Sequence, residues 1–389
     1  MLRRGPFHPI ATAPQPNRRR IKTNMASTAY TKSGTEFLLD RIDYERSLAM
    51  PYKSHTLKLE QMDELMEHLG SPQRSLRIIH VAGTKGKGST CHLLESILRA
   101  AGYRTGLYTS PHLEDLGERF RIDNRPATPA EIETEIALVR PIVQRMDDEG
   151  RAPTFFELTT ALAFHYFSRQ SVDFAVVEVG LGGRLDSTNV CDPLITAITS
   201  ISYDHTAILG NTLEEISREK AGIVKQTRPV FTTAWQPEVL NCIREIAEQH
   251  AAPFFQLGRD FSIATQSLGN RDTFDTFDVV IANQEEGIGE PPDTTVYSDL
   301  QLSVHGSRQQ DNTALAVAIC HHVAKLGWPV TPDQVRKGVK SAKIPARIEV
   351  FSELPYVVVD VAHNEASFRE LTSSLERLVA REPCSGMHD

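Results

Sequence analysis

Apolar runs that alternate with helical segments set the strongest limit on the fold of this chain. The runs span 78–82, 105–113, 172–183, 194–202 and 228–233. Strands covered on both faces have near-continuous apolar sequences, so the pattern predicts an α/β fold with a parallel sheet between layers of helices. Ligands of such folds bind outside the carboxyl ends of the strands, where the loops are expected to converge. The loops in question follow Ala82, Tyr108, Val177 and Ser202.

The first apolar run leads into a loop that is rich in glycine and lysine. Residues 83–88 read "GTKGKG", and a segment of helical periodicity begins at Ser89. Inward-pointing backbone N–H groups and the positive end of a helix favour a phosphate group, and Lys87 would add a full charge. Gly88 separates Lys87 from Ser89, which departs from the usual GxxxxGK[ST] pattern. A plain strand-to-helix connection therefore remains an alternative.

Helical periodicity predicts five helices around these strands. They span 57–69, 128–146, 155–170, 311–327 and 330–343. Thr128 is a favoured N-cap residue, and the proline that follows it is tolerated at the first helical position. Between 259 and 305 the pattern of apolar strands and helices gives way to short runs of alternating apolar and polar residues, around the acidic, Pro-rich stretch 284–293. That change predicts a small antiparallel appendage with a mobile loop.

The length of 389 residues makes more than one domain the default expectation. We expect an extension at 1–35, a central domain at 36–343 and an incomplete C-terminal domain at 344–389, where a new βαβ pattern begins. The extension contains arginines but no Asp or Glu, which fits either a transit peptide or, as we favour, a disordered tail before a start near Met25.

The composition of the chain limits the cellular compartments and the binding partners that we expect for it. The chain has no apolar stretch near the roughly 18 residues that a membrane helix requires. Its net charge of −8 opposes binding to nucleic acid or anionic lipid, so an anionic ligand needs a local positive site. The five cysteines are scattered without a CxxC pair, which favours a reduced, cytoplasmic setting over an organelle. We expect a monomer that binds small molecules.

Five motifs occur in a fixed order: "HVAGTKGKGST", "GLYTSPHL", "EVGLGGRLDSTNV", "SISYDHTAILGNTLEEISREKAGIVK" and "DVAHN". Together they resemble the folylpolyglutamate synthase/dihydrofolate synthase family of Mur-ligase-type ATP-dependent amide ligases, over about residues 36–365. The resemblance implies an ATP-binding α/β domain followed by a smaller α/β domain. It also implies a reaction that joins L-glutamate to dihydropteroate, to reduced folates or to both through an acyl phosphate, with Mg²⁺ neutralising the crowded oxygens.

The same resemblance implies the nucleotide contacts. Lys87 would contact the β- and γ-phosphates, Asn312 the adenine, Arg347 a phosphate, and Asp360 with His363 the ribose and phosphate. An N-cap at Asp311 is the structural alternative for the Asn312 segment. Ala346 stands where the family usually has glycine, which puts the linker geometry in doubt if that position needs a positive φ. The implied phosphate cradle comprises Gly83, Thr84, Lys85, Gly86, Lys87, Gly88, Ser89 and Thr90.

Three residues match the family positions that hold magnesium, of which two ions are expected: Ser110, Glu178 and His205. Their structural alternatives are a Ser-Pro turn, a surface carboxylate and a helix cap. Lys220 matches a lysine that the family carries as a carbamate, which a buried position would favour because the amine must first lose its proton. A solvated helix lysine is the alternative. The resemblance therefore implies catalytic roles for Lys87, His205 and Lys220.

Substrate choice is less well defined by the sequence. Phe155 and Phe156, with the loop "GLGGRLDSTNV", line the cleft expected for the pterin, although we favour core packing for both rings. The segment 157–159 resembles bacterial-type enzymes that make dihydrofolate. Two other functions remain open: a cell-wall precursor ligase of the same fold, and a nucleotide-binding but inactive protein whose closing domain is cut short.

Overall fold

A computed structural model describes residues 33–43, 59–265, 276–282, 294–302, 307–353 and 356–362, together with residues 368, 371, 372, 375 and 376. Its main element is an eight-stranded sheet in the order β4-β3-β2-β5-β1-β6-β7-β8. The predicted parallel sheet is confirmed, and its five predicted strands are β1 (Ile78–Ala82), β2 (Thr105–Tyr108), β5 (Phe174–Glu178), β6 (Ile195–Ile198) and β7 (Val230–Thr232). A sixth parallel strand, β8 (Phe254–Gln256), was not predicted.

One edge of this sheet is antiparallel and was not predicted. It is formed by β3 (Phe120–Ile122), which pairs with β2, and by the two-residue strand β4 (Arg125–Pro126). Elements this short carry little periodicity, so the sequence pattern does not reveal them. The hairpin closes the sheet on the side away from β8.

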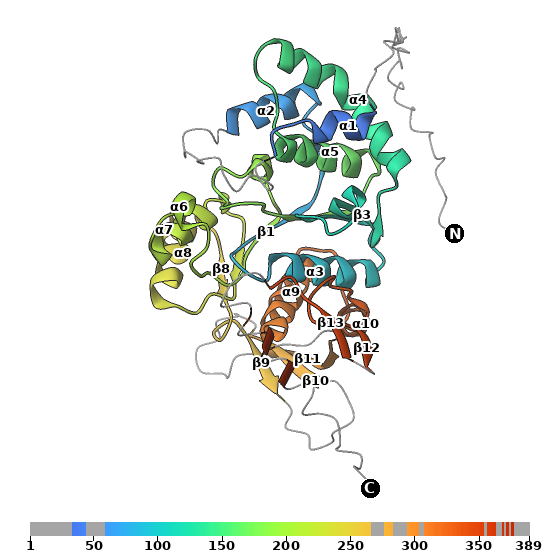
Figure 1. The fold of residues 1–389 in the computed structure, drawn as a ribbon. Coiled ribbons are helices and arrows are strands. Elements are labelled where there is room, and N and C mark those ends of the chain that lie inside the picture. The colour runs from blue at the N-terminus through green and yellow to red at the C-terminus, as the bar shows by residue number, and fades with distance from the viewer. Residues whose placement is uncertain are drawn as a thin grey trace, which may run out of the picture.

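Helices cover both faces of the sheet, as the apolar runs predict (Figure 1). Ile79 and Val81 of β1 belong to the apolar cluster on one face, and Ile78 belongs to the cluster on the other. The first cluster includes α3 (Lys87–Ala100), α9 (Ser307–Lys325) and α10 (Pro332–Ser341). The second includes α1 (Gly34–Leu39), α2 (Leu59–His68), α4 (Pro129–Asp148) and α5 (Phe155–Arg169).

A third apolar cluster lies beside β6 and β7. It is built from α6 (Thr206–Leu209), α7 (Leu213–Ala221) and α8 (Pro237–Gln249). Short 3₁₀ turns occur at η1 (Pro72–Ser75), η2 (Leu116–Arg119) and η3 (Ser187–Val190). Within the described residues, no helix has both the length and the apolar character that crossing a membrane requires.

Threonine N-caps start several helices. Thr128 accepts a hydrogen bond from the backbone N–H of Glu131, whose side chain returns a bond to the backbone of Thr128, as the predicted cap requires. Thr154 and Thr331 form the same reciprocal arrangement at α5 and α10. The helix predicted from 311 instead begins at Ser307, so the N-cap role considered for Asp311 is wrong.

The predicted antiparallel appendage is confirmed as a three-stranded sheet in the order β11-β10-β9. Its strands are β9 (Phe261–Thr265), β10 (Thr276–Ala282) and β11 (Thr294–Gln301). The mobile loop predicted at 284–293 and the extension up to residue 32 lie outside the described residues.

The two strands after residue 344 form a hairpin rather than the start of a parallel βαβ unit. β12 (Glu349–Glu353) pairs antiparallel with β13 (Tyr356–Val359). Only two residues separate the strands, and a parallel crossover needs about a dozen or more. The expectation of a βαβ pattern there is therefore wrong. The boundaries proposed for the three domains stay predictions.

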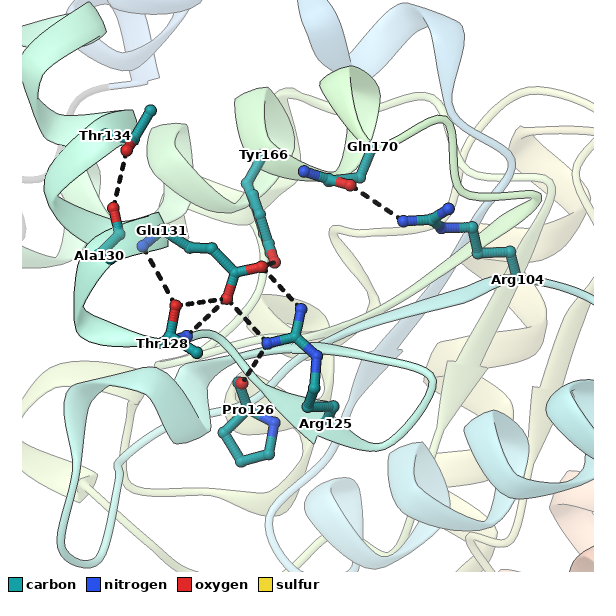
Figure 2. Close-up of polar contacts among 9 residues, drawn as sticks. All are labelled: Arg104, Arg125, Pro126, Thr128, Ala130, Glu131, Thr134, Tyr166 and Gln170. Atoms are coloured by element: carbon teal, nitrogen blue, oxygen red, sulfur yellow. Dashed lines mark hydrogen bonds and ion pairs between the residues drawn. The ribbon is translucent and has the colours of Figure 1, made fainter.

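A group of polar side chains fastens the β3–β4 edge to the helices above it, and we call Arg125, Thr128, Glu131 and Tyr166 the hairpin cluster (Figure 2). The guanidinium of Arg125 donates to both carboxylate oxygens of Glu131, at 2.8 and 2.7 Å. The Tyr166 hydroxyl of α5 donates to the same carboxylate at 3.1 Å. The cluster thus links the hairpin to α4 and α5.

Candidate functional site

The loops after β1 and β6 support each other at the carboxyl edge of the sheet. The Thr84 backbone N–H donates to the Ser200 carbonyl at 2.8 Å, and the Thr84 hydroxyl donates to the Ser202 carbonyl at 3.1 Å. The Ser200 hydroxyl donates to the Lys85 carbonyl at 3.1 Å. The convergence expected of these loops is confirmed. The supporting role of Ser200 and Ser202 was missed, although both stand in a motif that the sequence singles out.

Two glycines of the predicted phosphate loop leave no room for a side chain. Gly83 has φ 143°, and a Cβ built on it would lie 1.8 Å from the Thr199 Oγ1 atom. Gly86 has φ 91°, and a Cβ there would lie 2.4 Å from the Asn312 Oδ1 atom. Both the backbone conformation and the packing therefore require glycine. The fold also brings the buried Asn312 of α9 against the loop, while its contact with adenine stays a prediction.

The first turn of α3 has the properties of a phosphate site. The helix begins at Lys87, directly after the left-handed Gly86. Ser89 and Thr90 are buried, and the Thr90 hydroxyl oxygen has no hydrogen-bond partner within the described part of the chain. The N-terminal N–H groups of a helix lack partners within the helix and carry partial positive charge. These residues fit a bound phosphate chain.

Glu178 ends β5 beside this loop and is buried. Its Oε2 atom accepts a hydrogen bond from the Ser110 backbone N–H at 3.2 Å, and a Cβ built on Gly88 would lie 3.6 Å from the same oxygen. Burial raises the pKa of Glu178, while the charges of Lys87 and Arg347 and the Ser110 bond act to lower it. Predicted site residues from separate segments therefore meet at this carboxylate.

His205 is not brought into contact with the other two residues predicted to hold magnesium. It is the N-cap residue of α6, with φ 47°, but its side chain makes no capping bond. The imidazole is 56% exposed, and its Nε2 atom lies 3.8 Å from the Asp204 carboxylate. The described residues contain no group of three His, Cys, Asp or Glu side chains placed to hold a metal. The three-residue magnesium site stays a prediction.

Lys220 is buried at the end of α7, which makes the solvated-lysine alternative wrong. Only 4% of the residue is exposed, and its Nζ atom donates to the Gly83 carbonyl at 2.9 Å. Burial, with the nearby Lys87 charge adding to it, lowers the pKa of Lys220 to about 7. A large share of this amine is therefore uncharged at neutral pH. We call the loop 83–87 together with Glu178 and Lys220 the phosphate-loop edge.

The loop after β5 closes against the helix that carries Lys220. The Arg184 backbone N–H donates to the Glu219 carbonyl at 2.8 Å, and the Asn189 side chain donates to the Gly222 carbonyl at 3.1 Å. A Cβ built on Gly183 would lie 2.7 Å from the Lys220 carbonyl oxygen. The motif "GLGGRLDSTNV" thus forms a wall of the site.

The two phenylalanines differ in their surroundings. Phe155 is a core residue, and the guanidinium of the buried Arg119 lies 5.1 Å from its ring centre. Core packing is confirmed for this ring. Phe156 is half-buried, and a Cβ built on Gly180 would lie 2.4 Å from its Cζ atom. Phe156 therefore lies next to the loop after β5, and contact with a pterin stays a prediction.

Asp360, one of the C-terminal residues of the predicted site, has a structural role in the backbone around it. Its two carboxylate oxygens accept the backbone N–H groups of Ile348 at 3.0 Å and Ala362 at 2.7 Å. Ala346 adopts φ 49°, so this position does use the left-handed region that glycine favours. Ribose and phosphate contacts by Asp360 stay predictions, and His363 lies outside the described residues.

Known proteins resemble this chain in sequence and in fold. Residues 81–320 match the Mur ligase middle domain. The chain is 39% identical to the dihydrofolate synthase/folylpolyglutamate synthase of Bacillus subtilis over 84% of its own length and 74% of the relative. A solved FPGS-AMPPCP-folate complex superposes with a TM-score of 0.77 at 32% identity, covering 89% of this chain and 80% of that one. Folylpolyglutamate synthase from Mycobacterium tuberculosis, complexed with ADP and AMPPCP, gives 0.74 at 34% identity, covering 82% and 71%.

Proposed function

The chain belongs to the folylpolyglutamate synthase/dihydrofolate synthase family, and from this we propose that it is an ATP-dependent ligase that joins L-glutamate to dihydropteroate, to reduced folates or to both. A carboxylate is a poor electrophile. Transfer of the γ-phosphoryl group of ATP onto the pterin substrate's carboxylate gives an acyl phosphate, and attack by the glutamate amine then forms the amide and releases phosphate. ADP and phosphate are the expected by-products.

The observation that carries this proposal is the meeting of Lys87, Glu178 and Lys220 at one loop. Lys87 and the N–H groups at the start of α3 bind the triphosphate, and the Lys87 ammonium stabilises the negative charge that develops on the transferred phosphoryl group. Asn312 contacts the adenine from α9. The two phosphate-loop glycines let the backbone approach the nucleotide closely.

Ser110, Glu178 and His205 are the residues that would hold Mg²⁺, and hydroxyl and carboxylate oxygens with one imidazole suit that ion. When bound, the ion would neutralise charge on the phosphate oxygens. The hydrogen bond from the Ser110 N–H orients the Glu178 carboxylate, and burial leaves few other partners for its charge.

Lys220 is the residue we propose to be carbamylated. An uncharged amine is the form that reacts with CO₂, and the lowered pKa of about 7 makes that form abundant at neutral pH. The carbamate would add an anion near a second magnesium ion. Mass spectrometry of the intact protein in bicarbonate buffer, compared with Lys220→Ala, detects the added group.

Phosphate release is the experiment that tests the proposed function. The purified protein is given MgATP with each combination of dihydropteroate, tetrahydrofolate and L-glutamate, and a UDP-linked cell-wall precursor serves as the competing acceptor. Release that requires both a pterin substrate and glutamate supports the proposal. Release that needs neither substrate, or that follows only the UDP-linked acceptor, contradicts it. Lys87→Ala controls for contaminating ATPases.

A further inference from the structure

A chain of buried hydrogen bonds runs from the middle of β1 to the loop that walls the site. It starts at His80, which is fully buried, and its Nε2 atom lies 2.8 Å from the Thr188 hydroxyl oxygen. The Thr188 hydroxyl lies 2.5 Å from the Asp186 Oδ1 atom. On the other side of the ring, the Cys191 sulfur lies 3.7 Å from Nδ1. None of these four side chains has a role in the reaction as described above.

The proton positions in this chain follow from the number of donors available. Asp186 already accepts the backbone N–H of Thr188 on Oδ1, at 3.0 Å, and that of Leu181 on Oδ2, at 2.8 Å. Burial raises the pKa of Asp186, while the hydrogen bonds from Thr188 and Leu181 act to lower it. The three donors that face this side chain favour its ionised form, which only accepts hydrogen bonds, so the single hydroxyl proton of Thr188 goes to Asp186. The Thr188 oxygen then accepts from His80, whose one proton therefore lies on Nε2.

The other ring nitrogen of His80, Nδ1, has surroundings that fit a proton on Nε2. Burial lowers the pKa of His80 to about 3, so the ring is neutral and Nδ1 is an acceptor. Burial raises the pKa of the Cys191 thiol to about 12, so the S–H proton is present to be donated. The hydrogen bonds therefore run one way, from Cys191 through His80 and Thr188 to Asp186.

Asp186 in turn holds the turn that directly follows Glu178. Its bond from the Leu181 N–H fixes residues 180–183, where Gly182 adopts φ 69°. Within the same loop, Asn189 and Arg184 bind the backbone of the segment that contains Lys220. Two residues of the predicted site therefore adjoin the loop that Asp186 organises: Glu178 directly precedes it in the chain, and the segment that contains Lys220 binds its other end.

We propose that His80 is a positioning residue: by donating its Nε2 proton to Thr188 it fixes Asp186, and with it the turn that places Glu178 and faces Lys220. The kinetic part of this inference rests on the proposed ligase function. The structural part, the Nε2–H form of His80, stands independently of any activity. A side chain of similar shape that supplies an N–H at the Nε2 position should therefore keep the role.

The first test is the tautomer of His80 in the full chain. Proteins labelled with ¹⁵N-histidine give separate signals for the two ring nitrogens, and the His80→Gln variant identifies which signals belong to His80. Because the ring is buried, we expect it to be neutral and protonated at Nε2 throughout the range from about pH 6 to about pH 8. A proton on Nδ1, or a charged ring, would overturn the inference whether or not the protein is a ligase.

The second test separates positioning from mere folding. We expect His80→Leu and Thr188→Val each to lower kcat by about 10- to 100-fold with little change in the KM for ATP, the range found when supporting residues of a site are removed. His80→Gln should recover most of the loss. Ile78→Ala, a buried apolar substitution in the same strand, is the control, assayed far below its unfolding temperature.

Each outcome of the two tests either supports the positioning role of His80 or overturns it. Unchanged kcat in His80→Leu and Thr188→Val overturns it, as does an equal loss of kcat in Ile78→Ala. If His80→Leu does not fold, Thr188→Val and His80→Gln give the same comparison. If the wild-type chain has no ligase activity, the proposed function fails, and the ¹⁵N signals still decide the direction of the hydrogen bonds.

Discussion

The phosphate-loop edge and the hairpin cluster both bring opposite charges together, yet their charges respond in opposite ways. At the phosphate-loop edge, burial raises the pKa of Glu178 and lowers that of Lys220, so both groups move toward their neutral forms. In the hairpin cluster, the Arg125 bonds hold the pKa of Glu131 well below its usual range. Burial sets the direction of the pKa shifts at the phosphate-loop edge, and pairing with Arg125 sets the direction of the Glu131 shift in the hairpin cluster.

This difference separates a site from a structural link. The Glu131 carboxylate is fully provided with donors, from Arg125, Thr128 and Tyr166 (Figure 2). Glu178 and Lys220 are buried with few partners, which costs folding free energy unless a ligand or metal supplies the missing charge. Function at the phosphate-loop edge and stability at the hairpin cluster should therefore be separable by mutation.

The largest expected effect is on catalysis. Lys87→Ala removes the charge proposed to stabilise the transferred phosphoryl group, and kcat/KM should fall by about 100- to 1,000-fold. Arg125→Ala, which removes the cation of the hairpin cluster, should leave kcat/KM unchanged. Steady-state phosphate release measures both variants. Similar losses in the two would erase the distinction between the regions.

The next effect is a pH dependence of stability at Lys220. The pKa of Lys220 is about 7 in the folded protein, below the ordinary lysine value of 10.5, so between these values the unfolded chain binds one proton more than the folded one. Stability therefore rises with pH in that window, by at most about 1.4 kcal/mol per pH unit, and the contribution is absent below pH 7. Lys220→Met should lack this rise.

Urea unfolding at pH 7 and pH 9 in bicarbonate-free buffer measures the Lys220 effect. The free energy of unfolding of the wild-type chain minus that of Lys220→Met should increase between the two pH values. A difference that stays constant would mean that Lys220 keeps its proton in the folded protein. Lys225→Met is the matched control, because the Lys225 ammonium donates to the Asn189 carbonyl on the same loop.

The smallest effect is expected in the hairpin cluster. Arg125 is 54% exposed, so solvent screens its pairing with Glu131, and Arg125→Met should cost only about 0.5–1 kcal/mol at pH 7. The lowered pKa of Glu131 means that this stability is present above about pH 4.5 and is lost as the pH falls further. Urea unfolding at pH 7 and pH 3 should show the cost shrinking. A larger cost at pH 3 would contradict this account.

The sequence predicted the sheet and most of the phosphate loop because both depend on local patterns. Apolar runs identify buried strands, and a glycine between strand and helix marks a turn, whatever the rest of the chain does. β3 and β4 were missed because they are too short to show a periodicity. The β12–β13 hairpin was misread because the short connection between its strands was overlooked.

Long-range contacts explain the rest of what the sequence could not show. His80 stands in an apolar strand sequence, and its partner Thr188 is 108 residues away. Lys220 lies among charged residues in α7, so nothing local indicates that its side chain reaches the Gly83 carbonyl. Asn312 was assigned by resemblance alone, and only the fold shows that it lies against Gly86.

The most direct test of the account compares Glu178→Gln with Glu131→Gln, the same chemical change in the two regions. We predict that Glu178→Gln loses ligase activity while its free energy of unfolding at pH 7 stays equal or rises by about 1 kcal/mol, because a buried charge is removed. Glu131→Gln should keep full activity and unfold more easily. Retained activity in Glu178→Gln, or loss of activity in Glu131→Gln, would contradict the separation of function from stability proposed here.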